Sequence, residues 1–182
     1  NLQKDLALTG RTNPRMVLEA KWSEPAEAPA ANAQKILVVG AGPAGLEAAW
    51  VAAARGHQVT VWEDQPDVGG QLRFLECMDK RREFLGLLDY QKRELERYGV
   101  TLVLEKTAVT EQVVRLAPDV VVLSSGSLPV EMALPGGGRT YTLVEPLPSP
   151  DGSGKRVALY ATIAAWGILG AIEHCADLGK LV

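Results

Sequence analysis

A glycine-rich turn between an apolar run and an alanine-rich run constrains the fold of this chain more than any other feature. The turn has the spacing G-x-G-x-x-G and consists of Gly40, Ala41, Gly42, Pro43, Ala44 and Gly45. The run 36–39 before it predicts a strand buried on both faces. The run 43–55 after it predicts a helix that ends at Gly56. In that setting the glycines allow a tight turn, close approach of a pyrophosphate to the backbone, and close helix–strand packing.

An acidic residue follows at the expected place. Residues 58–63 predict a second strand, so the segment forms a right-handed strand–helix–strand unit. Glu63 ends this strand about twenty residues after the last glycine, where a carboxylate accepts hydrogen bonds from adenosine ribose hydroxyls and repels a 2′-phosphate. We therefore expect an ADP moiety rather than NADP, bound by Glu63 and its neighbour Asp64.

Composition and charge exclude several classes of protein. A chain of 182 residues with 47% hydrophobic and 23% charged residues is an ordinary packed protein, and its net charge of −3 argues against a nucleic-acid partner. No apolar stretch reaches the roughly 18 to 20 residues of a membrane span, and the first residues show no charged-then-apolar pattern from which we would expect a leader. Cys77 and Cys175 stand far apart without metal-ligand spacing. We expect a cytoplasmic protein with no membrane partner and no metal.

The remaining pattern predicts an α/β fold, a Rossmann-like parallel sheet. Residues 100–104 and 119–123 predict further strands, and 82–98 predict a helix ending at Gly99. A strand from 155 and a helix over 166–178 begin a second unit of the same kind. The predicted divisions are a linker or extended arm at 1–33, a dinucleotide-binding domain at 34–130, a Gly- and Pro-rich connection at 131–154, and an incomplete second, degenerate dinucleotide-type domain at 155–182.

The segment after Glu63 resembles a known family. It leads to Gly69, Gly70, Gln71, Leu72 and Arg73. This looks like the FAD-binding half of two-dinucleotide-domain flavoproteins, where the paired glycines lie beside the pyrophosphate and ribityl chain. With the order of Asn13-Pro14, linker, glycine turn and long helix, the chain resembles the carboxy-terminal FAD/ADP-binding region of the 2,4-dienoyl-CoA reductase and trimethylamine dehydrogenase family of NADH:flavin oxidoreductases.

The resemblance implies further cofactor-binding residues. Ser124-Ser125-Gly126 matches the family's Ala-Thr-Gly, where the chain passes close to the flavin nucleotide, and Val109 falls where such folds bring the chain beside the adenine. The residues implied by the resemblance are Gly70, Gln71, Leu72, Arg73, Val109, Ser125 and Gly126, added to the glycine turn, Glu63 and Asp64.

The chain also departs from the family pattern. After the strand at 155–160 there is no close-spaced glycine pair, so a nicotinamide dinucleotide lacks the turn it needs there. The family's barrel with FMN and an iron–sulfur cluster is absent. No catalytic residue is identified. We therefore expect these 182 residues to be a portion of a longer polypeptide, or a subunit that completes its sheet with another chain.

Two functions remain open. The first is the nucleotide-binding portion of an FAD-dependent oxidoreductase, which passes electrons to or from an FMN/iron–sulfur barrel or an electron-transfer protein outside this chain. The alternative is a non-catalytic domain that binds ADP as a structural ligand in an amine dehydrogenase-like assembly. Recovery of FAD or of ADP from the protein separates the two.

Overall fold

The computed structural model describes residues 28–77, 84–128, 156–159 and 166–182. These residues belong to two compact units: the first takes its residues from 1–70 and 86–126, the second from 71–85 and 127–182. Most of the predicted arm and the whole predicted connection lie outside the described residues. The division into domains therefore stays a prediction.

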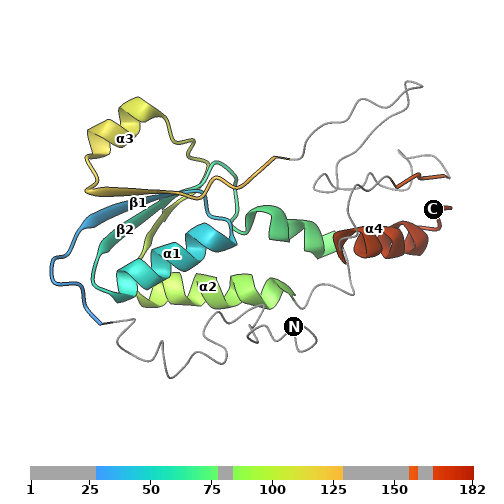
Figure 1. The fold of residues 1–182 in the computed structure, drawn as a ribbon, viewed down its shortest axis with the longest axis horizontal. Helices are drawn as coiled ribbons and strands as arrows, with labels where there is room; N and C mark the ends of the chain where they lie inside the picture. Colours follow the sequence, from blue (N-terminus) through green and yellow to red (C-terminus); the bar gives the residue numbers. More distant parts are fainter. Residues whose placement is uncertain (1–27, 78–83, 129–155, 160–165) are drawn as a thin grey trace, which may run out of the picture. The chain divides into compact units, whose positions relative to one another are not determined.

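The first unit is built on a parallel four-stranded sheet with the order β3-β2-β1-β4 (Figure 1). Its strands are β1 (Lys35–Val39), β2 (Gln58–Trp62), β3 (Thr101–Val103) and β4 (Val120–Leu123). In the register, Leu37 of β1 lies between Thr60 of β2 and Val121 of β4. Leu37 and Val38 are fully buried, as expected for a strand covered on both faces. The predicted Rossmann-like α/β class is confirmed.

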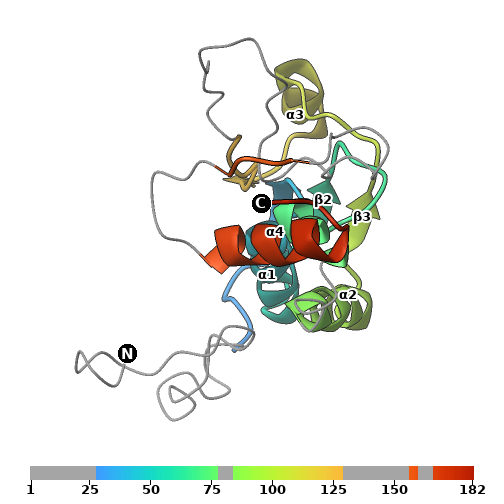
Figure 2. The same ribbon diagram turned by 90° about the vertical axis from the view of Figure 1, so that its right-hand side faces the viewer.

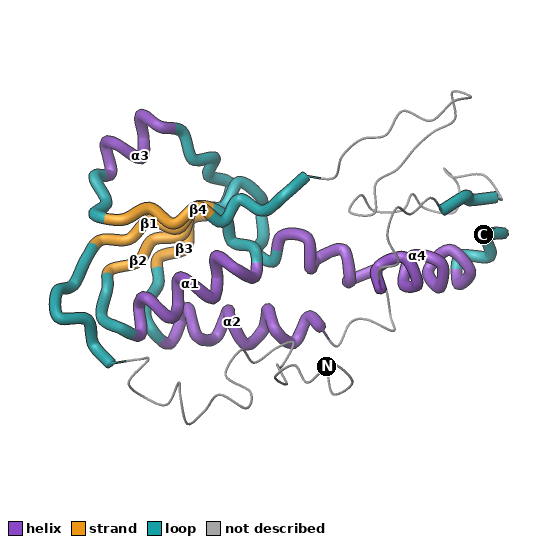
Figure 3. Tube along the Cα trace, in the orientation of Figure 1, coloured by secondary structure: helices purple, strands orange, loops and turns teal. Residues whose placement is uncertain are grey.

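Two helices cover one face of this sheet and one short helix lies on the other side (Figures 1 and 3). The covering helices are α1 (Pro43–Ala54) and α2 (Gly86–Arg97), and the short helix is α3 (Thr110–Leu116). α1 has proline at its first position, where the missing N–H costs nothing, and buries Leu46 and Ala49. It therefore runs directly from the turn that ends β1 onto the face of the sheet.

Three features of the first unit differ from the sequence prediction. α2 begins at Gly86 rather than at residue 82, because residues 84–85 form a tighter 3-10 turn. α3 was not predicted, since none of its seven residues is buried and its pattern carries no apolar face. β4 is more exposed than an unbroken apolar run suggests, with Leu123 at 78%, and it is an edge strand among the described residues.

The described residues of the second unit include a 3-10 segment and one helix. The 3-10 segment η3 (Gly70–Cys77) begins at the last residue of the first unit, and the helix α4 (Trp166–Asp177) precedes the last described residues (Figure 2). Arg156 and Leu181 form a parallel bridge, with the Val157 N–H donating to the Leu181 carbonyl at 2.9 Å. An isolated bridge is not a strand, so the second dinucleotide-type unit stays a prediction. Residues 160–165 lie outside the described residues. Within the described segments no helix has the length and apolarity to cross a bilayer.

Candidate nucleotide-binding site

The carboxyl ends of three neighbouring strands meet at one edge of the sheet. β1 leads into Gly40, β2 into Glu63 and β4 into Ser124. The chain turns from β1 toward β2 on one side and returns to β4 on the other, so the order of strands reverses at β1. In open parallel sheets a crevice for ligands opens at this point. The fold therefore places the glycine turn at the position where such sheets bind nucleotides.

Two of the three glycines are required by packing. Gly40 has φ of 99°, its N–H donates to the Trp62 carbonyl at 2.8 Å, and a β-carbon there would overlap the carbonyl oxygen of Ser124. A β-carbon on Gly45 would overlap the Gly40 carbonyl oxygen. The turn, the first residues of α1 and the end of β4 are thus in direct backbone contact.

The middle glycine faces open space. A β-carbon on Gly42 would meet no atom within 4 Å, and its φ of −69° is one that any residue adopts. Gly42 is the N-cap of α1, no side chain caps the first turn, and Pro43 supplies no N–H. An uncapped helix start carries partial positive charge and free backbone donors. The space beside Gly42 is therefore open and borders a helix start of the kind that binds anions.

The Glu63 carboxylate lies beneath the turn and is only 7% exposed. Its Oε2 accepts a hydrogen bond from the Ala41 N–H at 2.6 Å, and its Oε1 accepts one from the Gln65 N–H at 3.0 Å. A carboxylate has about four acceptor positions, so each oxygen retains one for a ribose hydroxyl. Glu63 thus holds the turn in shape, a role that the sequence did not predict.

The second glycine turn lies against the first. The Gly69 N–H donates to the Ala41 carbonyl at 2.8 Å. Gly70 has φ of 51°, and a β-carbon on it would lie 3.2 Å from the Cα of Gly42. The two turns predicted to flank one cofactor are therefore adjacent, and only glycine at position 70 leaves the space beside Gly42 open.

The other predicted site residues of the first unit are exposed. Ser125 follows the residue that packs on Gly40, and its backbone nitrogen would lie 3.1 Å from a β-carbon there. Gly126 is exposed and has φ of 74°. Asp64 is exposed and accepts a local hydrogen bond from Gln65 Nε2 at 3.1 Å. Val109 is 42% exposed at the N-cap of α3.

Three predicted residues belong to the second unit. Gln71 donates from Nε2 to the Ser127 carbonyl at 2.6 Å, which joins η3 to the segment that follows Gly126. Leu72 and Arg73 are half-buried in η3, and Arg73 Nε lies 3.9 Å from Glu76 Oε1. The contact of Gln71 with residue 127 links the chain after the second glycine turn to the chain after β4, the two segments that the resemblance assigns to the flavin nucleotide.

Ser124 contributes to the turn although the sequence prediction left it out. Its hydroxyl lies 2.8 Å from the Val39 carbonyl oxygen and 2.9 Å from that of Gly40, so it donates to the end of β1. The signal was present in the sequence, because serine stands here where the family pattern has alanine. The Ser124 hydroxyl therefore helps to hold the backbone at the start of the glycine turn in place.

The described residues hold no group of three or more histidine, cysteine, aspartate or glutamate side chains that could bind a metal ion. The site is therefore one of backbone donors, glycine turns and a single buried carboxylate.

This chain is similar to several known proteins. Residues 38–83 match the family model of the NAD(P)-binding Rossmann-like domain. A probable N-methylproline demethylase of Rhizobium meliloti is 36% identical over 82% of this chain and 22% of its own length. An NADH oxidase of Thermoanaerobacter brockii is 37% identical over 78% of this chain and 21% of its own length. A solved structure of 2-naphthoyl-CoA reductase with 2-naphthoyl-CoA is 34% identical, with a TM-score of 0.64, over 70% of this chain and 19% of that chain.

The chain spans about a fifth of the length of these relatives. Their names describe reductases, oxidases and demethylases, and the resemblance to flavoenzymes of the NADH oxidase and 2,4-dienoyl-CoA reductase type is confirmed. A flavin or nucleotide cofactor is the ligand class that this family supports.

Proposed function

We propose that this chain, the nucleotide-binding region of a flavin-dependent oxidoreductase of the NADH oxidase and 2,4-dienoyl-CoA reductase type, holds FAD. The observation that carries the proposal is the contact between the two glycine turns, in which Gly69 donates to Ala41 and Gly70 lies against Gly42. A nucleotide-binding sheet needs only the first turn. The second turn, placed beside the open space of the first, suits a ligand that continues past the pyrophosphate.

Each part of the site has a task in this proposal. Gly42 and the backbone donors at the start of α1, including that of the exposed Ala44, would hold the pyrophosphate. Glu63 accepts hydrogen bonds from the adenosine ribose through the acceptor positions that Ala41 and Gln65 leave free. The buried carboxylate disfavours a 2′-phosphate, so NADP is the wrong ligand for this site.

The flavin, when bound, supplies the redox chemistry, and the residues of this chain bind and orient it. The predicted contacts of the flavin end are Gln71, Leu72, Arg73, Ser125 and Gly126, and that of the adenine is Val109. In this proposal the substrate site and the redox partner lie outside this chain, in the remainder of a larger flavoenzyme or in a partner subunit. The electron donor or acceptor is an FMN/iron–sulfur barrel or an electron-transfer protein.

A second candidate is ADP as a structural ligand. It is favoured by the division of the predicted contacts: the residues assigned to the pyrophosphate and ribose lie in the first unit, whereas Gln71, Leu72 and Arg73 lie in the second. The residues predicted to bind ADP therefore all lie in the first unit.

Acid extraction of the purified chain, followed by chromatography of the released nucleotide, distinguishes the candidates. Recovery of FAD near one equivalent per chain supports the main proposal, and recovery of ADP supports the second. If neither is recovered, titration of the chain with FAD, ADP and 2′-phospho-ADP follows. Binding of none of them contradicts both candidates, and preference for 2′-phospho-ADP contradicts the role of Glu63.

A further inference from the structure

A buried amide links α2 to the start of α1. Gln91 of α2 is 2% exposed, and its Nε2 donates to the carbonyl oxygen of Pro43 at 3.0 Å and to Glu47 Oε2 at 3.0 Å. Pro43 is the first residue of α1 and directly follows Gly42. Gln91 therefore reaches from α2 to the first turn of α1. This is the turn that starts at Gly42, beside which the structure leaves open space.

The neighbours of Gln91 fix the orientation of its amide. Both atoms that face Nε2 are acceptors, so a reversed amide would set its carbonyl oxygen against two other oxygens. Gln91 Oε1 is buried and has no hydrogen-bond partner among the described residues. A buried acceptor without a partner costs free energy. The amide keeps this orientation although its oxygen has no partner. The function of glutamine at this position is therefore to donate the two hydrogen bonds from Nε2.

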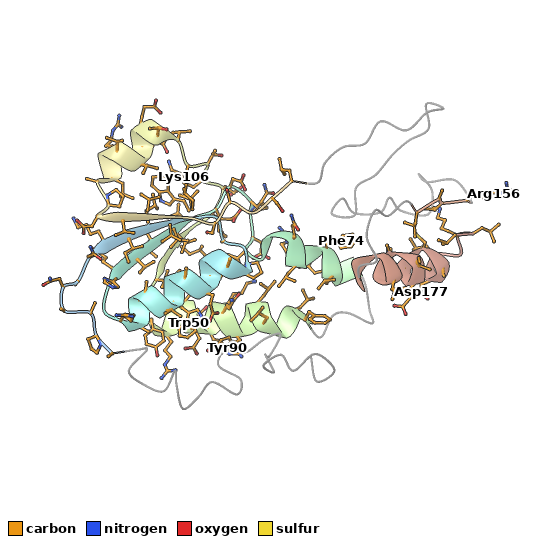
Figure 4. All side chains as sticks on the ribbon, viewed as in Figure 1. Trp50, Phe74, Tyr90, Lys106, Arg156 and Asp177 are labelled. Carbon is orange, nitrogen blue, oxygen red and sulfur yellow. The ribbon has the colours of Figure 1, made fainter. Side chains whose placement is uncertain are left out.

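The Glu47 carboxylate has a second donor. Trp50 Nε1 donates to the same Oε2 at 2.9 Å. The Trp50 ring is 3% exposed and packs edge-on against Tyr90 at 6.1 Å between ring centroids, where α1 meets α2 (Figure 4). Glu47 brings a negative charge close to the first turn of α1, where it would repel an anionic ligand. The Gln91 and Trp50 donors hold that carboxylate in one place and partly offset its charge.

We propose that Gln91 is a positioning residue for the nucleotide site. The inference rests on the proposed function, since it concerns the same pyrophosphate-binding turn. Gln91 fixes the carbonyl of Pro43 and the carboxylate of Glu47, and through them the direction of the free N–H groups at the start of α1. When the turn is not fixed, a smaller fraction of the protein is ready to bind, and the apparent affinity falls by that fraction.

Substitutions on α2 test the proposal in the full chain, with ADP as the ligand in calorimetric titrations. Gln91→Met keeps the length of the side chain and removes both donors. Gln91→Glu sets a carboxylate against Pro43 and Glu47. The double variant Gln91→Glu with Glu47→Gln restores an amide-to-carboxylate hydrogen bond with the donor on α1. Arg93→Met changes an exposed position of the same helix and is the matched control.

We expect Gln91→Met to weaken ADP binding by about three- to tenfold relative to Arg93→Met, as the net loss of one to two hydrogen bonds implies. Gln91→Glu weakens it further through repulsion between two carboxylates, and the double variant recovers part of the loss. A purely structural role would lower the melting temperature of both Gln91 variants but leave ADP affinity unchanged. Equal affinities of Gln91→Met and Arg93→Met overturn the proposal.

Hydrogen exchange separates failure of this inference from failure of the proposed function. If the unsubstituted chain binds neither ADP nor FAD, the proposed function is wrong. The exchange of the amides of residues 44–47 then decides the positioning role. Faster exchange in Gln91→Met than in Arg93→Met, confined to these amides, supports it, and equal exchange overturns it.

Discussion

The Glu63 carboxylate accepts a hydrogen bond of 2.6 Å from the backbone N–H of Ala41. This contact ties the end of the second strand to the middle of the glycine turn. The carboxylate is buried beneath the turn, and its other oxygen accepts the N–H of Gln65. One side chain therefore both shapes the turn and, in the proposed complex, contacts the ribose.

Substitutions of Glu63 are expected to lower stability as well as affinity. Glu63→Ala leaves the Ala41 and Gln65 donors without acceptors, at about 1–3 kcal/mol for each donor that stays buried. Glu63→Gln loses less stability, because its single amide oxygen can still accept a hydrogen bond from one of these two N–H groups. Urea unfolding measures the loss of stability in each of the two variants. Asp64→Asn, a substitution of an exposed neighbour, is the control. Equal unfolding midpoints for Glu63→Gln and Asp64→Asn would show that the carboxylate does not hold the turn.

Ser124→Ala is expected to destabilise the turn without disturbing the sheet. The substitution removes a hydroxyl that donates to the end of β1, for which a net loss of about 0.5–1.5 kcal/mol is typical, while the backbone hydrogen bond from the Ser124 N–H to Val39 stays. Thermal unfolding of Ser124→Ala and of the exposed control Ser125→Ala measures the difference. Identical melting temperatures would contradict a role for the hydroxyl.

Local patterns were enough to predict the center of the fold. The apolar run of β1, the glycine turn and the alanine-rich α1 each carry a strong signal of their own, and the acid after β2 follows from the spacing. The elements that were missed carry no such signal. α3 buries no residue, and η3 begins at a glycine with positive φ rather than with a helix cap.

Contacts between distant segments could not be read from the sequence. Gln91 lies 48 positions from Pro43, and nothing in α2 marks that residue as a donor to the start of α1. The contact of Gly69 with Ala41 could not be read from the sequence either. Only the family resemblance indicated that the two glycine turns bind the same cofactor. The exposure of β4 was also missed, because an apolar strand pattern does not reveal how many neighbours the strand has.

Cys175 is expected to be unreactive in the folded chain. Its thiol is 2% exposed, and burial raises its pKa, an effect that the positive charge of Lys180 opposes in part. The thiolate fraction at pH 8 is therefore small. In a Cys77→Ser variant, a thiol reagent at pH 8 should label Cys175 only after denaturation. Because the folded pKa is raised, the stability that this thiol contributes is present below the ordinary thiol pKa and is lost as the pH rises through the folded pKa. Rapid labelling of the native variant would contradict the burial of this residue.

Gly42→Ala and Gly45→Ala form a matched pair, since each adds one methyl group to the same turn. At Gly45 the methyl group would overlap the carbonyl oxygen of Gly40, so the chain is expected to lose several kcal/mol of stability, on the order of the larger overpacking costs. At Gly42 it meets no atom within 4 Å, so the expected loss is only the roughly 1 kcal/mol or less by which alanine is worse than glycine at a helix N-cap. Circular dichroism during thermal unfolding measures this difference. Equal destabilisation of the two variants would contradict the packing described for the turn.

The affinity of Gly42→Ala for FAD and ADP, measured by calorimetric titration beside the unsubstituted chain, tests whether the pyrophosphate binds over Gly42. The added methyl group occupies only the space assigned to the pyrophosphate. We expect the unsubstituted chain to bind one nucleotide, and Gly42→Ala, which stays folded, to bind it at least about tenfold more weakly. Equal affinity of the two proteins would contradict the placement of the pyrophosphate over Gly42.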